Sequence, residues 1–283
     1  MIKLEEITTT PTFTNQLENK ILYAKHHDDI SISYASTYSL KYVIEGTKYY
    51  NFDNQDIKIT KNQYLIINNN SCITTEAKKG TKGLSFFLSP KLISEIYKYH
   101  TNDTSQLEFL EVTQKKSNNE VGFLLDKITN LYEHNLLDFN RQMENLFIRI
   151  SEAIVQEQAN IDTGFATLKI VKHNTKKELF KLISVTKEYL NDSISEDISL
   201  ESMSRDIGIS KYYLHRLFTE INGTTPLGYL TTIRLAKAKH RLRYSKDSIF
   251  EIAIECGFDN TSYFSNLFKK HTGSTPTQYR KNL

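Results

Sequence analysis

Cysteine is scarce in this chain of 283 residues, and the scarcity excludes several kinds of site. The two cysteines, Cys72 and Cys256, lie in different halves of the chain, and neither has a nearby cysteine partner. This pattern excludes a CxxC zinc pair and suits a reducing compartment. Because Cys256 falls on the apolar face of a predicted helix, we expect it to be buried in a core; redox sensing is the alternative.

Long apolar runs are also missing. No run reaches the roughly 18 to 20 residues that span a bilayer. The segment 1–8 carries acidic residues where a signal peptide needs a basic start and an apolar stretch. We therefore expect a cytoplasmic protein with no membrane partner.

The N-terminal half lacks any set of residues that would support catalysis. No Ser/His/Asp set, paired carboxylates or metal-spaced cluster can be assembled there. The region 30–90 contains no histidine, since His26 and His27 precede it and His100 follows it. We expect no catalytic residue, no metal site and no cofactor, and an enzyme fused to a DNA-binding domain is the disfavoured alternative.

The composition fits a two-domain globular protein with a charge asymmetry. Hydrophobic residues make up 39% of the chain, enough for packed cores, and the length allows about two domains. Residues 1–160 carry a net charge of −3 and residues 161–283 a net charge of +6. Lysine outnumbers arginine 28 to 8, a bias typical of an A·T-rich bacterial genome. A basic half suits a domain that approaches phosphates, although an ordinary solvated surface can carry such a charge.

A motif that occurs twice near the C-terminus is the strongest signal. Residues 200–218 lead to Gly223 and Pro226, and residues 249–268 lead to Gly273 and Pro276, equivalent positions that lie 50 residues apart. In each copy the apolar positions recur at helical spacing, with a glycine (Gly208, Gly257) where the first helix must turn. Each copy therefore predicts a helix-turn-helix, whose second helix lies in the DNA major groove. A helical bundle is the alternative, which the spaced duplication and the basic surroundings disfavour.

Local signals mark where the helices of this region begin. Ser248 with Glu251, and Thr275 with Gln278, have the spacing of a capping box. Pro226 and Pro276 each follow a threonine and suit the first helical position, where a missing N–H is harmless.

The N-terminal half changes from a strand pattern to a helix pattern. Short segments rich in β-branched and aromatic residues predict a small antiparallel barrel or sandwich; they cover residues 39–46, 47–52, 56–60, 63–68 and 83–88. Apolar stripes predict helices over 121–132 and 143–155, which pack within the domain or form a dimer contact. Residues 159–177 lose periodicity and predict a linker, after which a helix over 178–190 opens the C-terminal domain. The predicted organisation is residues 1–160, a linker over 161–177, and residues 178–283.

Over residues 181–281 the chain resembles the AraC/XylS family of bacterial transcription regulators. The landmarks occur in order: the first helix-turn-helix, the Gly-x-x-Pro junction, a connecting helix over 227–243, the second helix-turn-helix, and the segment 276–280. The resemblance implies an α+β protein with an N-terminal cupin-like β-barrel and flanking helices. It implies a C-terminal all-α domain of two helix-turn-helix subdomains joined by a connecting helix. Segments 43–46 and 59–67 sit where the cupin-like domain has hairpin and rim strands.

Helical phase separates inward-facing from groove-facing residues in each recognition helix. In the first copy Leu214, Leu217 and Phe218 pack inward and leave Tyr212, His215 and Arg216 for the groove. Arg216 can donate two hydrogen bonds to a guanine edge, and Tyr212 can lie against a thymine methyl. The resemblance implies the same base-reading positions.

The second recognition helix presents smaller side chains. Phe264, Leu267 and Phe268 pack inward, and the predicted DNA-facing residues are Thr261, Ser262, Ser265 and Asn266. Asn266, where many relatives carry arginine, can pair with adenine, whereas the other three read bases weakly or simply face solvent. We expect the first helix to supply most sequence discrimination and the second to contribute positioning and shape readout.

Cations near the helix ends are candidates for phosphate contacts. They are Lys211, Lys269, Lys270 and Arg280, whereas Arg234 on the connecting helix is expected to be a structural ion-pair partner. Two helices from one chain should enter major-groove segments about 34 Å apart, which predicts a long, non-palindromic site.

These features predict a sequence-specific regulator that binds double-stranded promoter DNA and recruits RNA polymerase. The resemblance favours activation over repression, and an N-terminal domain that senses a signal and can form a homodimer. The signal is either a small molecule or a regulatory protein, as in the family's type III secretion and virulence activators. Aromatic residues that might line a small-molecule pocket are Tyr42, Tyr49, Tyr50, Phe52 and Tyr64. An architectural DNA binder without effector control is the alternative.

Overall fold

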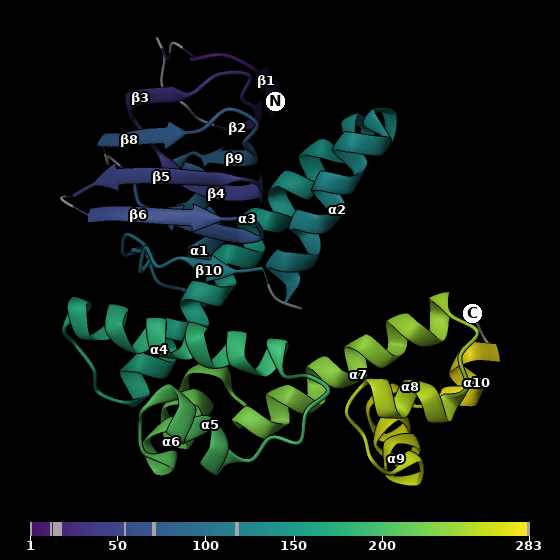
Figure 1. Cartoon of the computed structure of the whole chain (residues 1–283). Coiled ribbons are helices and arrows are strands. Elements are labelled where there is room, and N and C mark those ends of the chain that lie inside the picture. The colour runs from purple at the N-terminus through teal and green to yellow at the C-terminus, as the bar shows by residue number, and fades with distance from the viewer. Residues whose placement is uncertain are drawn as a thin grey trace. The chain divides into compact units, whose positions relative to one another are not determined.

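The computed structural model describes residues 2–11, 13, 19–53, 55–69, 72–116 and 119–281. The chain divides into two compact units, Met1–Lys181 and Leu182–Leu283 (Figure 1). Every strand of the described residues belongs to the first unit, and the second is helical. The protein is therefore a mixed α+β protein, as expected. None of the helices in these ranges has the length and apolar character needed to cross a membrane.

The strands of the first unit form two sheets. A six-stranded sheet has the order β1-β2-β9-β4-β7-β10, and a four-stranded sheet has the order β3-β8-β5-β6. Among the strand pairs of the described residues, only β1–β2 is parallel. The bounds are β1 Lys3–Ile7, β2 Lys20–Lys25, β3 Ile30–Ala35, β4 Tyr38–Glu45, β5 Thr47–Phe52, β6 Gln55–Thr60, β7 Gln63–Ile67, β8 Cys72–Ala77, β9 Lys82–Leu88 and β10 Gln114–Lys115.

The two sheets pack face to face instead of closing into the predicted cupin-like barrel. Val43 and Leu65 of the six-stranded sheet pack with Tyr50, Phe52 and Ile73 of the four-stranded sheet in one buried cluster. No strand pairing in the described ranges joins the two sheets. The chain instead changes sheets through turns, as at Gly46, whose φ of 84° suits glycine. The closed barrel is therefore wrong as a description of these residues, whereas the alternative of a sandwich describes them.

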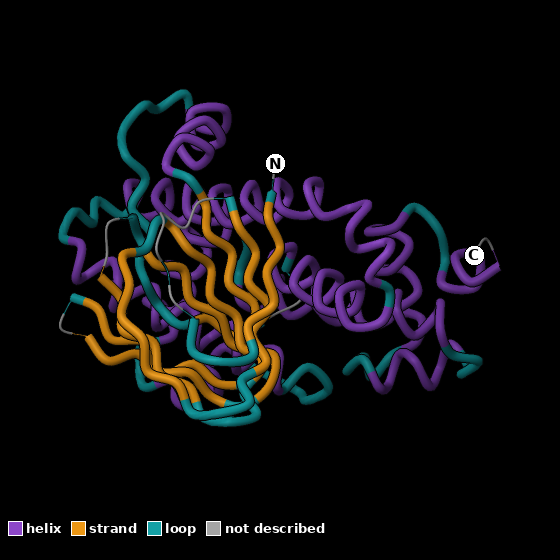
Figure 2. Tube along the Cα trace, turned by 90° about the horizontal axis from the view of Figure 1, so that it is seen from above, coloured by secondary structure: helices purple, strands orange, loops and turns teal. Residues whose placement is uncertain are grey.

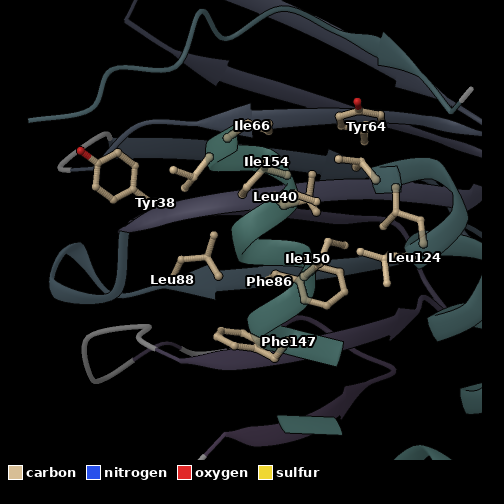
Figure 3. Packing of buried hydrophobic residues seen from close by; sticks show 14 of the residues in the cluster. Tyr38, Leu40, Tyr64, Ile66, Phe86, Leu88, Leu124, Phe147, Ile150 and Ile154 are labelled. Atoms are coloured by element: carbon tan, nitrogen blue, oxygen red, sulfur yellow. The ribbon is translucent and has the colours of Figure 1, made fainter. Parts of the chain in front are cut away.

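Three helices cover the other face of the six-stranded sheet (Figure 2). They are α1 Pro90–Thr101, α2 Glu120–His134 and α3 Leu136–Thr167. Phe147, Ile150 and Ile154 lie on one face of α3 and point toward Leu40 and Phe86 of the sheet (Figure 3). The predicted packing of the two apolar stripes within the domain is confirmed by this core.

The segment over 161–177 is more helical than its sequence indicated. Helix α3 runs to Thr167, and α4 His173–Asp192 begins six residues later. Ile161 and Phe165 are buried in α3, but the polar residues between them interrupt the apolar stripe, so the pattern did not show a helix. The division between the two units falls within α4, after Lys181.

Over its described residues, 182–281, the second unit consists of the end of α4 and six further helices. They are α5 Leu200–Ile207, α6 Lys211–Asn222, α7 Pro226–Tyr244, α8 Ile249–Glu255, α9 Thr261–Thr272 and α10 Pro276–Lys281. The pair α5–α6 lies toward the start of α7 and the pair α8–α9 toward its end (Figure 1). The expected burial of Cys256 is confirmed, and burial raises the pKa of its thiol to about 11.

The predicted helix starts of the second unit are confirmed. Ser248 N–H donates to Glu251 Oε2 over 2.7 Å, and Glu251 N–H donates to Ser248 Oγ over 3.1 Å, which completes a capping box. Thr275 and Gln278 exchange hydrogen bonds in the same way. Pro226 and Pro276 occupy the first positions of α7 and α10.

Candidate nucleic-acid interface

The first helix-turn-helix is formed by α5, a tight turn and α6. Helix α5 ends at Gly208, whose φ of 82° lies in the left-handed region that favours glycine. Helix α6 begins where Ser210 Oγ accepts a hydrogen bond from Tyr213 N–H. These two local signals fix the turn, and they position the exposed face of α6.

Helix α6 separates its two faces as the helical phase predicts. Leu214, Leu217 and Phe218 are buried, whereas Tyr212, His215 and Arg216 are exposed. Tyr212 is 80% exposed, so its ring is available to a partner. The structure thus brings an aromatic ring, an imidazole and a guanidinium together on one helix face.

Lys211 already forms an ion pair within the first helix-turn-helix. Its Nζ lies 2.5 Å from Glu201 Oε1 of α5, and this pairing raises the pKa of Lys211 and lowers that of Glu201. A phosphate contact by Lys211 therefore competes with an existing ion pair within the same helix-turn-helix.

The second helix-turn-helix is formed by α8, the turn at Gly257 and α9. Asn260 Oδ1 accepts from Tyr263 N–H over 2.9 Å at the start of α9. Phe264 and Phe268 are buried, and Leu267 is partly buried against the same core. Among the predicted DNA-facing residues Ser262 and Asn266 are exposed, whereas Thr261 and Ser265 are half-buried.

Exposed tyrosines lie at the equivalent position of both recognition helices. Tyr213 is 45% exposed and Tyr263 is 60% exposed, and the motif repeat places them 50 residues apart. The sequence interpretation passed over both residues, although the repeated position was visible in the duplicated motif. Lys269 and Lys270, near the end of α9, are exposed as well.

The guanidinium of Arg234 in α7 donates hydrogen bonds to backbone carbonyls of the segment that precedes α5. Its Nε donates to Ile194 O over 2.8 Å, and a terminal nitrogen donates to Glu196 O over 2.5 Å. Burial lowers the pKa of this guanidinium. The expected structural role is found, but with carbonyl acceptors in place of the carboxylate partner of an ion pair.

Gly257 packs against this same arginine. A Cβ at Gly257 would lie 2.6 Å from Ile194 O and 2.8 Å from Arg234 Nε, and the φ of Gly257 is 79°. The turn of the second helix-turn-helix is therefore in direct contact with the segment that leads into the first one. Arg280, the remaining candidate for a phosphate contact, has a buried Nε without a hydrogen-bond partner in the described residues.

The aromatic residues proposed for a ligand pocket do not gather in one place. Tyr42 and Tyr64 pack in the core that the helices cover, Phe52 lies between the two sheets, and Tyr49 is 44% exposed. Only Tyr50 borders a cavity within the sandwich. Lys41 and Lys48 are buried near that cavity, and the sequence analysis did not predict their burial.

Two family patterns match the chain. The pattern described as a helix-turn-helix domain matches residues 203–282, and the pattern described as the ExsA N-terminal regulatory domain matches residues 39–170. The first match spans both recognition helices, and the second spans most of the sandwich and the helices that cover it.

Two curated relatives are described as transcriptional activators. The transcriptional activator RhaS of Mannheimia succiniciproducens is 30% identical over 170 residues, 60% of this chain and 58% of that protein. RhaS of Escherichia fergusonii is 38% identical over 108 residues, 38% of this chain and 37% of that protein. The chain thus spans less than two thirds of the length of these curated relatives.

Among solved structures, the C-terminal domain of AraT, a response regulator from Geobacillus stearothermophilus, is 34% identical. It covers 36% of this chain and 85% of that chain, with a TM-score of 0.35. None of the matches named here is described as an enzyme.

Proposed function

The chain belongs to the AraC/XylS family of transcription regulators, and from that premise we propose that it is a sequence-specific activator of transcription. It binds promoter DNA in two adjacent major-groove segments, through residues of its second unit. The observation that carries this proposal is the exposed face of α6, where Tyr212, His215 and Arg216 stand clear of the buried stripe within a duplicated helix-turn-helix.

The length of α7 supports simultaneous use of both recognition helices. With 19 residues, α7 is about 28 Å long at 1.5 Å per residue. Successive major-groove segments on one face of DNA lie about 34 Å apart. Two helix-turn-helix pairs toward opposite ends of α7 therefore suit a site with half-elements about one helical turn apart.

The chemistry of each exposed face sets its role. Arg216 reads guanine through two N–H donors, and Tyr212 packs against a thymine methyl. On α9, Asn266 pairs with adenine, while Ser262, with the half-buried Thr261 and Ser265, makes weaker contacts. The first helix consequently carries more of the discrimination between sequences.

Phosphate contacts anchor the protein in register. Lys269 and Lys270 are exposed and suit this role. Lys211 would have to break its ion pair with Glu201 before it could bind a phosphate. The hydroxyls of Tyr213 and Tyr263 are additional donors to phosphate oxygens. Such contacts carry no sequence information, so they raise affinity for all duplexes alike.

The first unit controls the second and joins the protein to its partners. Its likeness to a domain described as regulatory supports control by an effector, either a small molecule or a regulatory protein. Activators of this kind act by recruiting RNA polymerase, and the named relatives are described as activators. Exposed apolar residues of α2 and α3, such as Phe123 and Leu137, support a homodimer through this unit.

Replacing Arg216 by alanine tests the proposal. The variant should lose about 1 to 3 kcal/mol of binding free energy for its preferred site and lose selectivity at one base pair. Lys270→Ala, the matched control, should weaken binding to every duplex alike and lower the salt dependence. Binding of labelled duplexes, with circular dichroism to check folding, gives both results. Unchanged sequence-specific binding by folded Arg216→Ala would refute the proposal, and binding without sequence preference would indicate an architectural protein.

A further inference from the structure

Three cations lie along one face of the connecting helix α7. Arg234, Lys237 and Arg241 are spaced three and four residues apart, which places them on the same side of a helix. Helix α8 runs beside the second half of α7 (Figure 1). Contacts made by this face can therefore connect the two helix-turn-helix pairs, which lie toward opposite ends of α7.

Lys237 connects the end of α8 to the segment that precedes α5. Its Nζ donates to Glu255 O over 2.8 Å and to Ser195 Oγ over 3.2 Å. Ser195 Oγ in turn donates to Glu255 O over 2.7 Å, which closes a triangle of hydrogen bonds. Because Ser195 lies shortly before α5, which begins at Leu200, the triangle joins the two helix-turn-helix pairs directly and not only through α7.

The carbonyl of Glu255 is a strong acceptor for this cation. Glu255 is the last residue of α8. The last carbonyls of a helix lack partners within the helix and carry the partial negative charge of its dipole. The lysine ammonium and the serine hydroxyl satisfy this carbonyl together. The triangle therefore holds the end of α8, where the chain turns at Gly257 toward the recognition helix α9.

Arg241 and Arg234 support the triangle from its two sides. Arg241 pairs with Asp247 over 2.7 Å and with Glu255 over 2.6 Å, so it binds residues at both ends of α8. Arg234 donates to the two backbone carbonyls that flank Ser195 in the sequence. Both partners of Lys237 are thus held in place against α7.

The triangle adds a second connection to the one that the core provides. Leu235 and Ala238 of α7 already pack with Ile252 of α8 and Phe264 of α9 in one buried cluster. Two subdomains joined by a single helix can still change their relative angle when that helix bends. A second contact, away from the axis of α7, restricts this motion, and the orientation of α6 relative to α9 is then nearly fixed.

We infer that Lys237 is a positioning residue that sets how strictly the protein measures the spacing between its two half-elements on DNA. The inference rests on the proposed function and adds a determinant of specificity to it. One added or removed base pair shifts a half-element by about 3.4 Å along the duplex and rotates it by about 34°. Recognition helices held by the triangle do not follow this shift, whereas helices joined by α7 alone follow it in part.

Binding of the full chain to duplexes of altered spacing tests this role. The probes carry the motif that the chain enriches from random DNA, with the spacer unchanged, one base pair shorter or one base pair longer. The parent chain should bind the unchanged spacer at least tenfold more tightly than either altered one. Ser195→Ala/Lys237→Met, which removes the triangle, should lower this ratio at least threefold. A duplex with only the half-element read by α6 should bind both proteins equally.

Three further variants separate positioning from charge and from folding. Lys239→Met removes the same charge from α7 at a position about 200° around the helix from Lys237, and it should keep the parent's ratio. Lys237→Arg retains a donor for Glu255 O and should keep most of the ratio. Lys237→Met alone leaves the bond from Ser195 in place and should give an intermediate ratio, with circular dichroism to check folding.

Two results would overturn the inference. One is a parent chain that binds all three spacers equally, and the other is a folded Ser195→Ala/Lys237→Met that keeps the parent's full ratio. Either result, together with an enriched two-part motif, retains the proposed function and removes the role of Lys237. Enrichment of no motif contradicts the proposed function itself, and the role of Lys237 fails with it.

Discussion

The burial of Lys48 makes the free energy of unfolding depend on pH. Its pKa falls from an ordinary value of 10.5 to about 8 in the folded protein because burial disfavours the charged form. Between these two values the unfolded chain keeps a proton that the folded chain has lost, so the free energy of unfolding rises with pH. From pH 8 to 9.5 we expect Lys48 to contribute a rise of about 1 to 2 kcal/mol.

Urea unfolding at several pH values, compared between the parent chain and Lys48→Met, measures this contribution. The comparison is necessary because other groups titrate nearby in pH. Lys41 acts in the same direction as Lys48, whereas the raised pKa of Cys256 acts in the opposite direction above pH 9. Identical pH dependence in the two proteins would show that Lys48 keeps an ordinary pKa.

At the residue scale, the sequence predicted side-chain exposure correctly where helical periodicity alone determines it. Helical phase alone predicted the exposure of Tyr212, His215 and Arg216, and the structure confirms it. It failed for Lys48, because a lysine in a strand normally faces solvent. The alternation of Lys48, Tyr50 and Phe52 could have predicted this burial, because all three residues lie on one face of β5.

The two-residue period of a strand also explains why the aromatic residues predicted to line one pocket lie in different places. Tyr49 and Tyr50 are neighbours in β5, so one faces outward and the other inward. Tyr42 and Tyr64 face the helices and not the second sheet. Which face of a strand meets which layer depends on contacts between distant segments, which a single sequence does not display.

At the scale of elements, the contact between Gly257 and Arg234 gives a specific expectation. Gly257 and Gly273 both have φ near 80°, but only Gly257 has backbone and guanidinium atoms where a Cβ would be placed. Gly273→Ala should cost about 1 to 2 kcal/mol of stability, the penalty of a left-handed backbone. Gly257→Ala should cost about 3 kcal/mol or more, because steric overlap adds to that penalty.

Urea unfolding of the two alanine variants measures the difference, with Gly273→Ala as the matched control. Equal losses would mean that Arg234 moves aside without a penalty and does not brace the turn. A larger loss for Gly257→Ala would support α7 as the link that fixes the second helix-turn-helix against the segment before the first.

Elements that depend on local chemistry were predicted well. The capping boxes at Ser248 and Thr275 and the prolines at the starts of α7 and α10 lie where the sequence indicated. The end of α3 was missed, because Asp162, Thr163 and Gly164 interrupt its apolar stripe while Ile161 and Phe165 remain buried. Tertiary burial, not helical periodicity, maintains that part of the helix.

At the scale of the whole molecule, the sequence indicated two parts that differ in net charge and in predicted secondary structure. It could not decide between a barrel and a sandwich, because closure depends on pairing between strands far apart in the chain. The observed pairing leaves two separate sheets in the described residues. The cavity between those sheets, with its two lysines, is a product of that packing.

Selection of binding sites from random duplex DNA by the full chain, at two salt concentrations, tests the central claim most directly. A regulator that uses α6 and α9 together should enrich one non-palindromic motif of two half-elements about one helical turn, or roughly 34 Å, apart. The half-element read by Arg216 should contain the stronger guanine preference. Enrichment of no motif at either salt concentration, with affinity that simply falls as salt rises, would contradict the claim.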